Sequence, residues 1–474
     1  MPESDEPRPR VPGDTRAPGG SRARPAFGAR LVLPLCLGAT MNPVNSTMIA
    51  PALTSIGRDL HASTAATLWL VSAMYLASAV GQPVAGRLAD RVGARRVFLT
   101  GGVLVAVAGL LGALAPTLPV LVGARVVIGL GTAAAYPSAL AMIRARAEAA
   151  DAPAPDRALG ALTTSGLVTL AVGPPLGGVL VELAGWRSTF AVNTALGLLT
   201  VLLALAWLPR DPSGRAGSRW RGLDLPGMAL FGLTITFLLL FLMGLPRPGW
   251  PLLAAALVAA ACLAVVELRT AQPFLDLRML AANRPLALTY VRFALTFVLI
   301  YGVLFGYTQW LEQVRGLSPA ASGLVLLALS GVGAVLAFAG ARARSVRGPL
   351  LVGTLGLLGG SLGLLALHAQ AAPLALVGVA ALFGLPQGLN AVANQAAVYR
   401  QAPPGALGTA SGLSRTAQYI GAVLASTAIA LSFGDTASDA GLDVLATVCT
   451  ALAVVLLVLT VLDRSLRRRR ATGT

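Results

Sequence analysis

The chain has little charge and no lysine. Only 12% of its 474 residues are charged, 56% are hydrophobic, and the mean hydropathy is +0.76. A soluble protein of this length needs far more charge to cover its surface. The composition therefore excludes a soluble globular protein and predicts one whose solvent is the lipid bilayer.

Cysteine and histidine are also scarce, with three and two residues. Cys36, Cys262 and Cys449 each lie in an apolar segment, without the spacing of a disulfide framework or a metal site. Neither the apolar segments nor their loops contain paired carboxylates, a nucleophile motif or a phosphate-binding loop. The sequence therefore predicts no metal, no cofactor and no enzymatic activity.

The net charge of +17 would suit a nucleic-acid-binding protein, but the positions of the basic residues argue against one. Most of the 36 fall in segments that would share one face of a membrane, whereas Arg58, Arg187, Arg247 and Arg315 fall in loops of the opposite face. In membrane proteins, the loops on the cytoplasmic side carry an excess of basic residues. This bias predicts that both termini are cytoplasmic and that nucleic acid is not a partner. The exclusive use of arginine indicates GC-rich coding, so we expect the plasma membrane of a bacterium.

Fourteen apolar stretches are long enough to cross a bilayer, which takes about 18 to 25 residues. We expect an all-helical multi-pass membrane protein. The fourteen predicted helices cover residues 28–50, 65–87, 97–115, 118–143, 158–184, 189–208, 226–243, 251–268, 286–309, 319–340, 349–368, 372–396, 408–432 and 441–463.

The loops divide these helices into six, two and six. The Arg-rich turn after residue 340 stands in the second half where Gly86–Val97 stands in the first, which indicates an internal repeat of the kind found in transporters. The predicted organisation is a disordered tail at 1–27, a six-helix half at 28–208, cytoplasmic linkers with an inserted helix pair at 209–285, a second six-helix half at 286–463 and a basic tail at 464–474.

The turn Gly86–Val97 is the most informative segment, because it follows one apolar helix and leads directly into the next. Its pattern G-x-L-A-D-R-x-G-x-R-R resembles the signature between helices 2 and 3 of the major facilitator superfamily. The resemblance implies a cytoplasmic latch in which the acid binds the positive end of the helix that starts near Gly405 to Ser411; the alternative is a turn that only sets topology. The predicted latch residues are Gly86, Asp90, Arg91, Gly93, Arg95 and Arg96.

The predicted fifth helix carries a second signature. It fits G-x8-G-x3-G-P-x2-G-G at five of six positions, with Thr169 in place of the second glycine. Gly-Pro weakens and bends a membrane helix, and the flanking glycines allow close packing. The pattern resembles the antiporter motif of the family's exporters, and the count of fourteen helices resembles the drug:proton antiporter branch. The motif residues are Gly160, Gly173, Pro174, Gly177 and Gly178.

Two positions in the first half concern proton coupling. Arg125 begins a segment that resembles the R-x-x-Q-G motif of the family, with Ile128 in place of the glutamine. The resemblance links this arginine to proton transfer; an arginine that snorkels near the outer end of the helix is the alternative. Relatives carry Asp-x-Thr in the first helix, but this chain has Asn45 and Thr47. Asparagine cannot titrate. A coupled proton would then be carried by Asp90, by Glu182 or by a water network around Arg125.

The lack of an acid in the middle of any predicted helix also concerns the substrate. A buried cation needs a countercharge, and the interior offers Arg125 and, unless it reaches the interface, Arg292. We therefore expect a neutral, zwitterionic or anionic small molecule. Other predicted cavity-lining residues, with helix–helix hydrogen bonding as the alternative, are Tyr75, Gln387, Asn390 and Asn394.

The sequence thus predicts a secondary active exporter of drug-like molecules or secondary metabolites, working by proton antiport and alternating access. The alternative is an importer, or a facilitator without proton coupling, for a polar or anionic metabolite. Asn45 favours the alternative, and the motif in the fifth helix opposes it.

Overall fold

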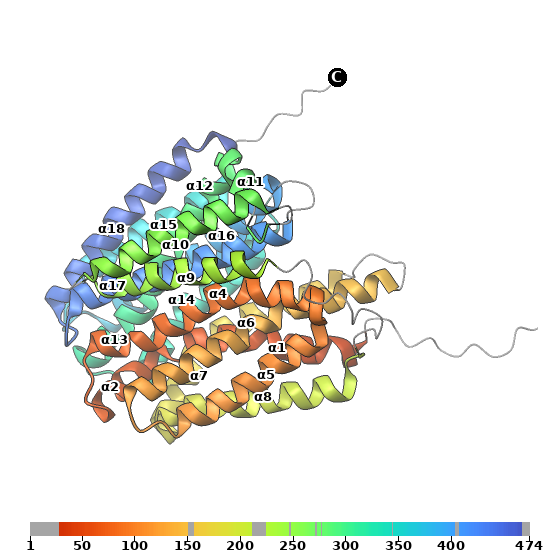
Figure 1. Ribbon diagram of the computed structural model, residues 1–474. Coiled ribbons are helices and arrows are strands. Elements are labelled where there is room, and N and C mark those ends of the chain that lie inside the picture. Colours follow the sequence, from red (N-terminus) through yellow and green to blue (C-terminus); the bar gives the residue numbers. More distant parts are fainter. Residues whose placement is uncertain are drawn as a thin grey trace, which may run out of the picture.

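The protein is described by a computed structural model, shown in Figure 1. It describes residues 28–149, 156–210, 224–245, 248–270, 273–275, 277–343, 345–402 and 407–466. The predictions for Arg247, for most of the first linker, for the N-terminal tail and for the C-terminal tail after residue 466 lie outside these residues. Within them the chain is helical and no strand is found.

The first part of the chain forms one group of helices. They are α1 (Ala29–Thr47), η1 (Ala50–Ala52), α2 (Leu53–Asp59), α3 (Thr64–Thr67), α4 (Trp69–Val92), α5 (Ala94–Ala113), α6 (Leu118–Ala149), α7 (Asp156–Ala184) and α8 (Arg187–Trp207). We call this group the N-terminal bundle, because its helices pack mainly on one another, with α1 against α6, α7 and α8 and with α4 and α5 against α6.

The last part forms a second group, the C-terminal bundle. It contains α12 (Arg284–Tyr301), the π-helical turn η3 (Gly302–Tyr307), α13 (Thr308–Gln313), α14 (Pro319–Ala341), α15 (Arg347–Leu365), α16 (Pro373–Gln401), α17 (Leu407–Phe433) and α18 (Asp439–Leu462). Between the bundles in sequence lie α9 (Leu225–Met243), α10 (Trp250–Arg269) and the short α11 (Leu277–Ala282). The turn η4 (Arg464–Leu466) follows α18.

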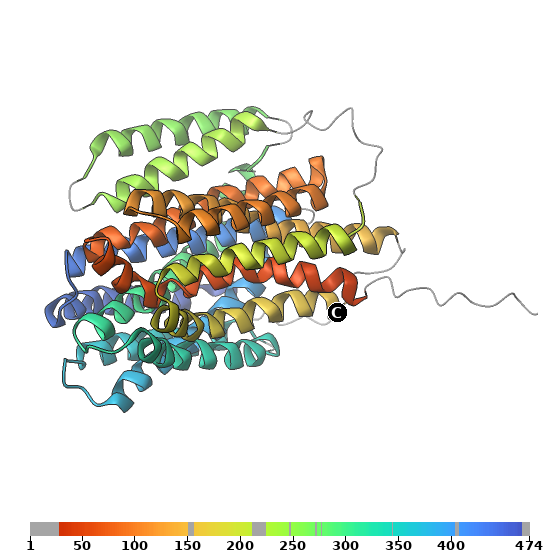
Figure 2. The same ribbon diagram turned by 90° about the horizontal axis from the view of Figure 1, so that it is seen from below.

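The bundles meet along two helix pairs. Helix α4 packs against α17, and α7 packs against α14. The α9–α10 pair is a separate layer at the edge of the molecule, drawn in green in Figure 2, and α9 contacts both α4 and α17. On the N-terminal side, this contact is therefore made by the two helices that carry the sequence motifs. Helix α4 carries the Arg-rich motif, and α7 carries the glycine-rich one.

Thirteen helices are long and apolar enough to cross a membrane within the described part of the chain. Two of these spans are composite, because α3 continues into α4 and α12 continues through η3 into α13. Helix α1 is not among the thirteen. It is 19 residues long, and Asn42, Asn45, Ser46 and Thr47 make its second half polar.

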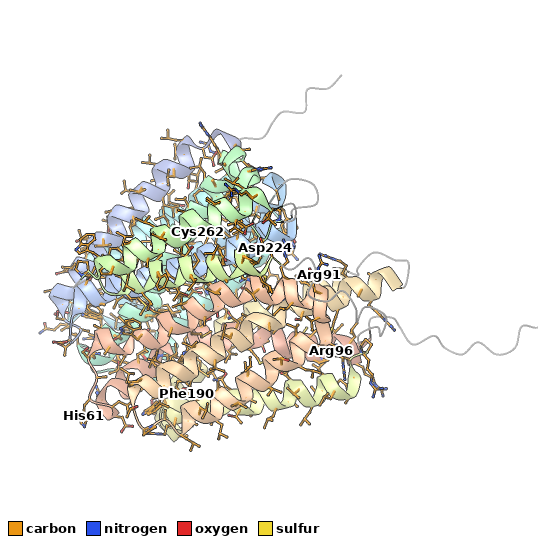
Figure 3. The ribbon with its side chains drawn as sticks, viewed as in Figure 1. His61, Arg91, Arg96, Phe190, Asp224 and Cys262 are labelled. Atoms are coloured by element: carbon orange, nitrogen blue, oxygen red, sulfur yellow. The ribbon has the colours of Figure 1, made fainter. Side chains whose placement is uncertain are left out.

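The two ends of the molecule are distinguished by their turns. In Figure 3 Arg91, Arg96 and Asp224 lie at one end and His61 at the other. We call these the Arg96 end and the His61 end. Because consecutive long helices alternate in direction, the turn at Gly93 lies at the Arg96 end, whereas the turns at 314–318 and 434–438 lie at the His61 end.

Observed and predicted helices agree to within a few residues, with two instructive differences. Helix α6 continues to Ala149, six residues past its predicted end, because a helix that leaves the bilayer can carry Arg144 and Arg146. The first helix breaks earlier than predicted, at Thr47, and the chain continues through η1 and α2 with Pro51 in the break. At Gly93 φ is 118°, a conformation that favours glycine, so α5 starts directly after α4 ends.

Candidate functional site

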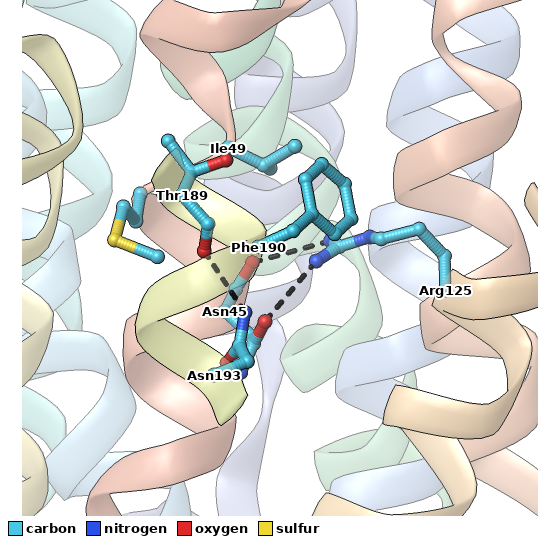
Figure 4. A pocket seen from close by; sticks show the side chains of 7 residues that line it. Asn45, Ile49, Arg125, Thr189, Phe190 and Asn193 are labelled. Atoms are coloured by element: carbon cyan, nitrogen blue, oxygen red, sulfur yellow. Dashed lines mark hydrogen bonds between the residues drawn. The ribbon is translucent and has the colours of Figure 1, made fainter. Parts of the chain in front are cut away.

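Arg125 is the centre of a polar cluster inside the N-terminal bundle (Figure 4). Its side chain is 1% exposed. The guanidinium donates from Nε to the Leu70 carbonyl at 2.9 Å, and its two terminal nitrogens donate to the Asn45 carbonyl at 3.2 Å and the Asn45 Oδ1 at 3.4 Å. In turn, the Asn45 amide donates to Asn193 Oδ1 at 2.5 Å, and the Asn193 amide donates to the Thr189 carbonyl at 3.0 Å.

Every acceptor in this cluster is a neutral oxygen. Two ion pairs are present in the described residues, Arg187 with Asp59 and Arg292 with Asp463, and neither involves Arg125. Burying a charge without a counterion is costly even when its hydrogen bonds are made. The cluster therefore favours negative charge and disfavours positive charge nearby. The pocket beside it is lined by Asn45, Met48, Ile49, Arg125, Thr189, Phe190 and Asn193.

The glycines of the motif in α7 lie at close helix contacts. A Cβ at Gly173 would lie 1.8 Å from Thr47 Oγ1, and one at Gly177 would lie 2.2 Å from the Met48 carbonyl oxygen. These two glycines therefore let α7 approach the end of α1. The Thr47 hydroxyl itself donates to the Pro43 carbonyl at 3.0 Å.

Gly178 faces the other bundle. A Cβ there would lie 2.2 Å from the Pro319 carbonyl oxygen at the start of α14, and a Cβ at Gly323 of α14 would lie 2.6 Å from the Pro174 carbonyl oxygen. Backbone thus meets backbone across the contact between the bundles. Gly160, at the beginning of the motif, has no neighbour within 4 Å of such a Cβ among the described residues.

An aromatic cluster joins the bundles near their middle. Tyr75 of α4 lies 5.1 Å from Tyr301, 5.7 Å from Tyr419 and 6.5 Å from Phe305, measured between ring centroids. All four rings are buried. Phe305 belongs to the π-helical turn η3, and such turns occur frequently at functional sites. The sequence analysis predicted Tyr75 as a site residue.

Arg415 of α17 is a functional candidate that the sequence analysis missed. Its guanidinium lies 5.6 Å from the ring centroid of Tyr136, in the other bundle, and it donates to Gln418 Oε1 at 3.2 Å. Gln418 donates to the Tyr301 hydroxyl at 3.1 Å. The signal was a charged residue inside an apolar stretch, which indicates function by default.

The predicted amide face of α16 is buried. The Asn390 amide donates to Thr354 Oγ1 of α15 at 3.3 Å, so this side chain joins two helices. Gln387 Oε1, Asn390 Oδ1 and Asn394 Oδ1 are buried and have no hydrogen-bond partner within the described protein. The face therefore combines helix–helix bonding with three free acceptor atoms.

Arg292 is buried in the C-terminal bundle. It is 1% exposed, pairs with Asp463 just after α18 and donates to Thr289 Oγ1 at 2.6 Å. Its charge is therefore neutralised inside the C-terminal bundle. Burial alone would raise the pKa of Asp463, but hydrogen bonds from Ser465 and Arg292 hold it below its usual value.

The basic turn is tied to its surroundings by its arginines. Arg95 donates to the Leu205 carbonyl near the end of α8 at 3.2 Å, a favourable place for a cation. Gly86 approaches Pro137 of α6, with 3.7 Å between a Cβ built there and the proline Cβ. Asp90 is exposed, and within the described residues its carboxylate makes no hydrogen bond and no ion pair. Residues 403–406, at the start of its predicted partner helix, lie outside them.

Arg87, from the same motif, also binds the segment that follows α10. Arg87 donates to the Pro273 carbonyl at 2.7 Å, and the Phe274 amide donates to Asp224 Oδ2 at 3.1 Å. The Leu275 amide donates to Glu267 Oε2 at 3.1 Å. Asp224 and Glu267 thus bind backbone amides of the linker.

A family model described as Major Facilitator Superfamily matches residues 35–426. The chain belongs to this superfamily of transporters, and it is a multi-pass membrane protein.

The relatives in sequence include bacterial resistance and export proteins. The chain is 34% identical over 414 residues to the uncharacterised MFS-type transporter YwoD of Bacillus subtilis, covering 86% of this chain and 91% of the relative. It is 31% identical to the tetracenomycin C resistance and export protein of Streptomyces glaucescens, covering 89% and 80%. It is 29% identical to the multidrug efflux pump LfrA of Mycolicibacterium smegmatis, covering 89% and 83%.

Solved structures show the same fold at low sequence identity. A mutant of the nucleoside transporter NupG superposes with a TM-score of 0.64 at 13% identity, covering 91% of this chain and 99% of the other. The inward-open xylose transporter XylE from E. coli superposes with a TM-score of 0.62 at 15% identity, covering 90% and 95%.

Proposed function

We propose that this transporter exports small organic molecules, drug-like compounds or secondary metabolites, across a bacterial plasma membrane in exchange for protons. Two six-helix bundles, with the α9–α10 pair inserted between them, alternate access to a central site. The resistance and export proteins among its relatives support this direction of transport. We infer a carrier and not an enzyme, because the functional groups described above bind and neutralise charge but form no nucleophile–base pair.

The observation that carries the proposal is the contact made by the α7 motif. Gly177 and Gly178 bring α7 against α1 on one side and against α14 on the other, with backbone atoms at the contact. A seam without side chains can close tightly when the bundles come together and separate without repacking. Such a seam suits an antiporter, which must prevent leak of its coupling ion between turnovers.

The orientation follows from charge. We propose that the Arg96 end is cytoplasmic, that both termini lie there, and that α1 completes fourteen spans. Arg91, Arg95 and Arg96 flank the break at Gly93 at this end, whereas Arg58, Arg187 and Arg315 belong to the His61 end. The bias is that of the positive-inside rule.

The polar groups of the interior favour a neutral, zwitterionic or anionic substrate. Arg125 supplies a buried positive charge that no carboxylate neutralises among the described residues. On α16, the side-chain oxygens of Gln387 and Asn394 can accept hydrogen bonds from a substrate. The rings of Tyr75 and Tyr301 offer it an apolar, aromatic surface.

The second candidate is an importer, or a facilitator without proton coupling, for a polar or anionic metabolite. Asn45 favours it, because this residue cannot titrate where relatives carry an acid. Cells with and without the protein should be loaded with labelled test compounds, before and after a proton uncoupler. Lower accumulation that the uncoupler reverses supports the exporter. Higher accumulation that the uncoupler leaves unchanged supports the facilitator and contradicts the proposal.

Asn45→Asp is expected to admit lipophilic cations. The new carboxylate would lie beside Arg125 and supply the countercharge that the cluster lacks. A hydrogen bond to a charged group contributes about 1.5–3 kcal/mol, so we expect roughly tenfold or greater gain in cation transport. Asn45→Ala removes the amide without adding charge and is the matched control. Equal cation transport by both variants would contradict the electrostatic argument.

Asp90→Asn is expected to lower transport about two- to thirtyfold. In the predicted latch, Asp90 binds the positive N-terminal end of α17, and a carboxylate at such an end contributes about 0.3–2 kcal/mol. Expression and membrane insertion should stay unchanged, since Asp90 is exposed. Initial transport rates at equal protein density test this, with Asp443→Asn, an exposed acid of α18, as the control. Wild-type rates in the Asp90 variant would remove the latch role.

A further inference from the structure

Glu312 of α13 is a buried carboxyl group that the cluster around Arg125 does not use. Glu312 is 3% exposed and lies in the last turn of α13, next to the His61 end. Oε1 accepts a hydrogen bond from Ser322 Oγ of α14 at 2.7 Å. Oε2 is buried and has no hydrogen-bond partner within the described protein.

The groups that meet Oε2 come from the opposite bundle. Helix α13 packs against η1 and α2, and Thr54 of α2 faces Glu312 with a buried hydroxyl that also has no partner. The next residue, Gln313, bonds to Thr64 Oγ1 of the N-terminal bundle at 3.2 Å and accepts from the Ala437 amide at 2.8 Å. Glu312 is therefore enclosed by the contact that closes the His61 end.

Few charges act on Glu312. The positive charge of Arg58 in α2 acts on the Glu312 carboxyl group. Asp59, the residue after Arg58, forms an ion pair with Arg187 at 2.8 Å. Asp439, at the start of α18, accepts from the Trp310 indole at 2.8 Å. The other elements packed against α13, which are η1, η3 and α14, contain no charged residue.

Closing the bundles around Glu312 removes its carboxyl from water. An ionised carboxylate in such a place costs several kcal/mol, and the group takes up a proton instead. A proton on Oε2 would also give the unpartnered Thr54 hydroxyl a donor, so one proton satisfies two buried polar atoms.

We propose that Glu312 is the group that loads a proton when the His61 end closes. In the open arrangement it takes the proton from the solution on that side, and closure then buries the neutral acid against Thr54. This inference rests on the proposed proton antiport. It assigns the loading step to the C-terminal bundle, in a chain whose first helix carries Asn45, which cannot titrate.

The linkage is tested by the distance across the His61 end as a function of pH. His61→Cys and Thr436→Cys, both exposed and in opposite bundles, carry spin labels in a full-length chain whose native cysteines are replaced by alanine. Double electron–electron resonance in lipid nanodiscs then gives the fraction of open molecules from pH 5 to 9. We expect this fraction to rise with pH, because only the ionised carboxylate favours the open, hydrated state.

Three variants make the result specific. Glu312→Gln should stay closed at every pH, because it is permanently neutral. Thr54→Val should retain the pH dependence, because the carboxyl group of Glu312 is still buried when the bundles close. Asp443→Asn is the matched control: it replaces an exposed acid near the start of α18, at the same end, and we expect the parental curve.

A parental pH curve in Glu312→Gln would overturn the inference, as would a parent whose open fraction does not change with pH. The proposed function fails separately. If no test compound is exported while the pH-dependent closure persists and disappears in Glu312→Gln, proton loading at this site stands and the export of such molecules does not.

Discussion

Gly178→Val is expected to lower transport about 10- to 100-fold. A Cβ at this position would meet the Pro319 carbonyl oxygen at 2.2 Å and the Ala320 Cα at 2.9 Å. Both are backbone atoms at the start of α14, so neither can move aside as a flexible side chain does. Overpacking of this kind costs typically 1–3 kcal/mol, and each 1.36 kcal/mol is tenfold in rate. The penalty falls on the state in which α7 and α14 are in contact.

The control is Gly160→Val in the same helix. It introduces the same β-branched side chain, but among the described residues nothing lies within 4 Å of a Cβ there. Initial rates in proteoliposomes with equal amounts of each variant separate the contact from the helix propensity of valine. Equal rates for the two variants would show that the seam between α7 and α14 is not needed for turnover.

Asp463→Asn is expected to destabilise the protein by about 3–5 kcal/mol, because removing one partner leaves the other as an uncompensated buried charge. Arg292 is that partner and is 1% exposed. The loss should appear as a lower unfolding temperature in detergent. Asp443→Asn, an exposed acid of α18, the helix that ends just before Asp463, should leave the unfolding temperature unchanged. The double replacement Arg292→Met with Asp463→Leu should recover most of the loss, since apolar side chains can replace a buried ion pair.

The pH dependence of this pair has a defined sign. Because the pKa of Asp463 is lowered in the folded protein, its contribution is fully present above the ordinary range of a carboxyl and is lost as pH falls through the lowered value. Between pH 5 and 8 the pair therefore adds no pH dependence to stability. If Asp463→Asn unfolds at the wild-type temperature throughout this range, the pair has no structural role.

The fold could be predicted from the sequence because a bilayer constrains it strongly. Apolar length sets where helices exist, and glycine or proline marks where they stop, as Gly93 does with its φ of 118°. Hydropathy does not determine whether an apolar stretch forms one continuous α-helix. The π-helical turn η3 inside the span Arg284–Gln313, and the break between α1 and α2, depend on packing with helices distant in sequence.

The candidate site was predictable in part. The motif glycines Gly173, Gly177 and Gly178 have the close contacts that their spacing indicates. Partners were not predictable, because they come from far along the chain: Asp463 lies 171 residues after Arg292. Glu312 stood near the end of a predicted helix, a position typical of exposed acids, and its burial by the opposite bundle is visible only in three dimensions.

The central claim is proton-coupled export of substrates that need no buried carboxylate. The measurement uses everted vesicles that contain the protein, an imposed proton gradient and a fluorescent pH probe, with cationic, neutral and anionic compounds added in turn. Vesicles prepared without the protein are the control for passive leak. The account predicts that neutral or anionic compounds dissipate the gradient in wild-type vesicles only. Measurable transport of such compounds with no change in the gradient would contradict it.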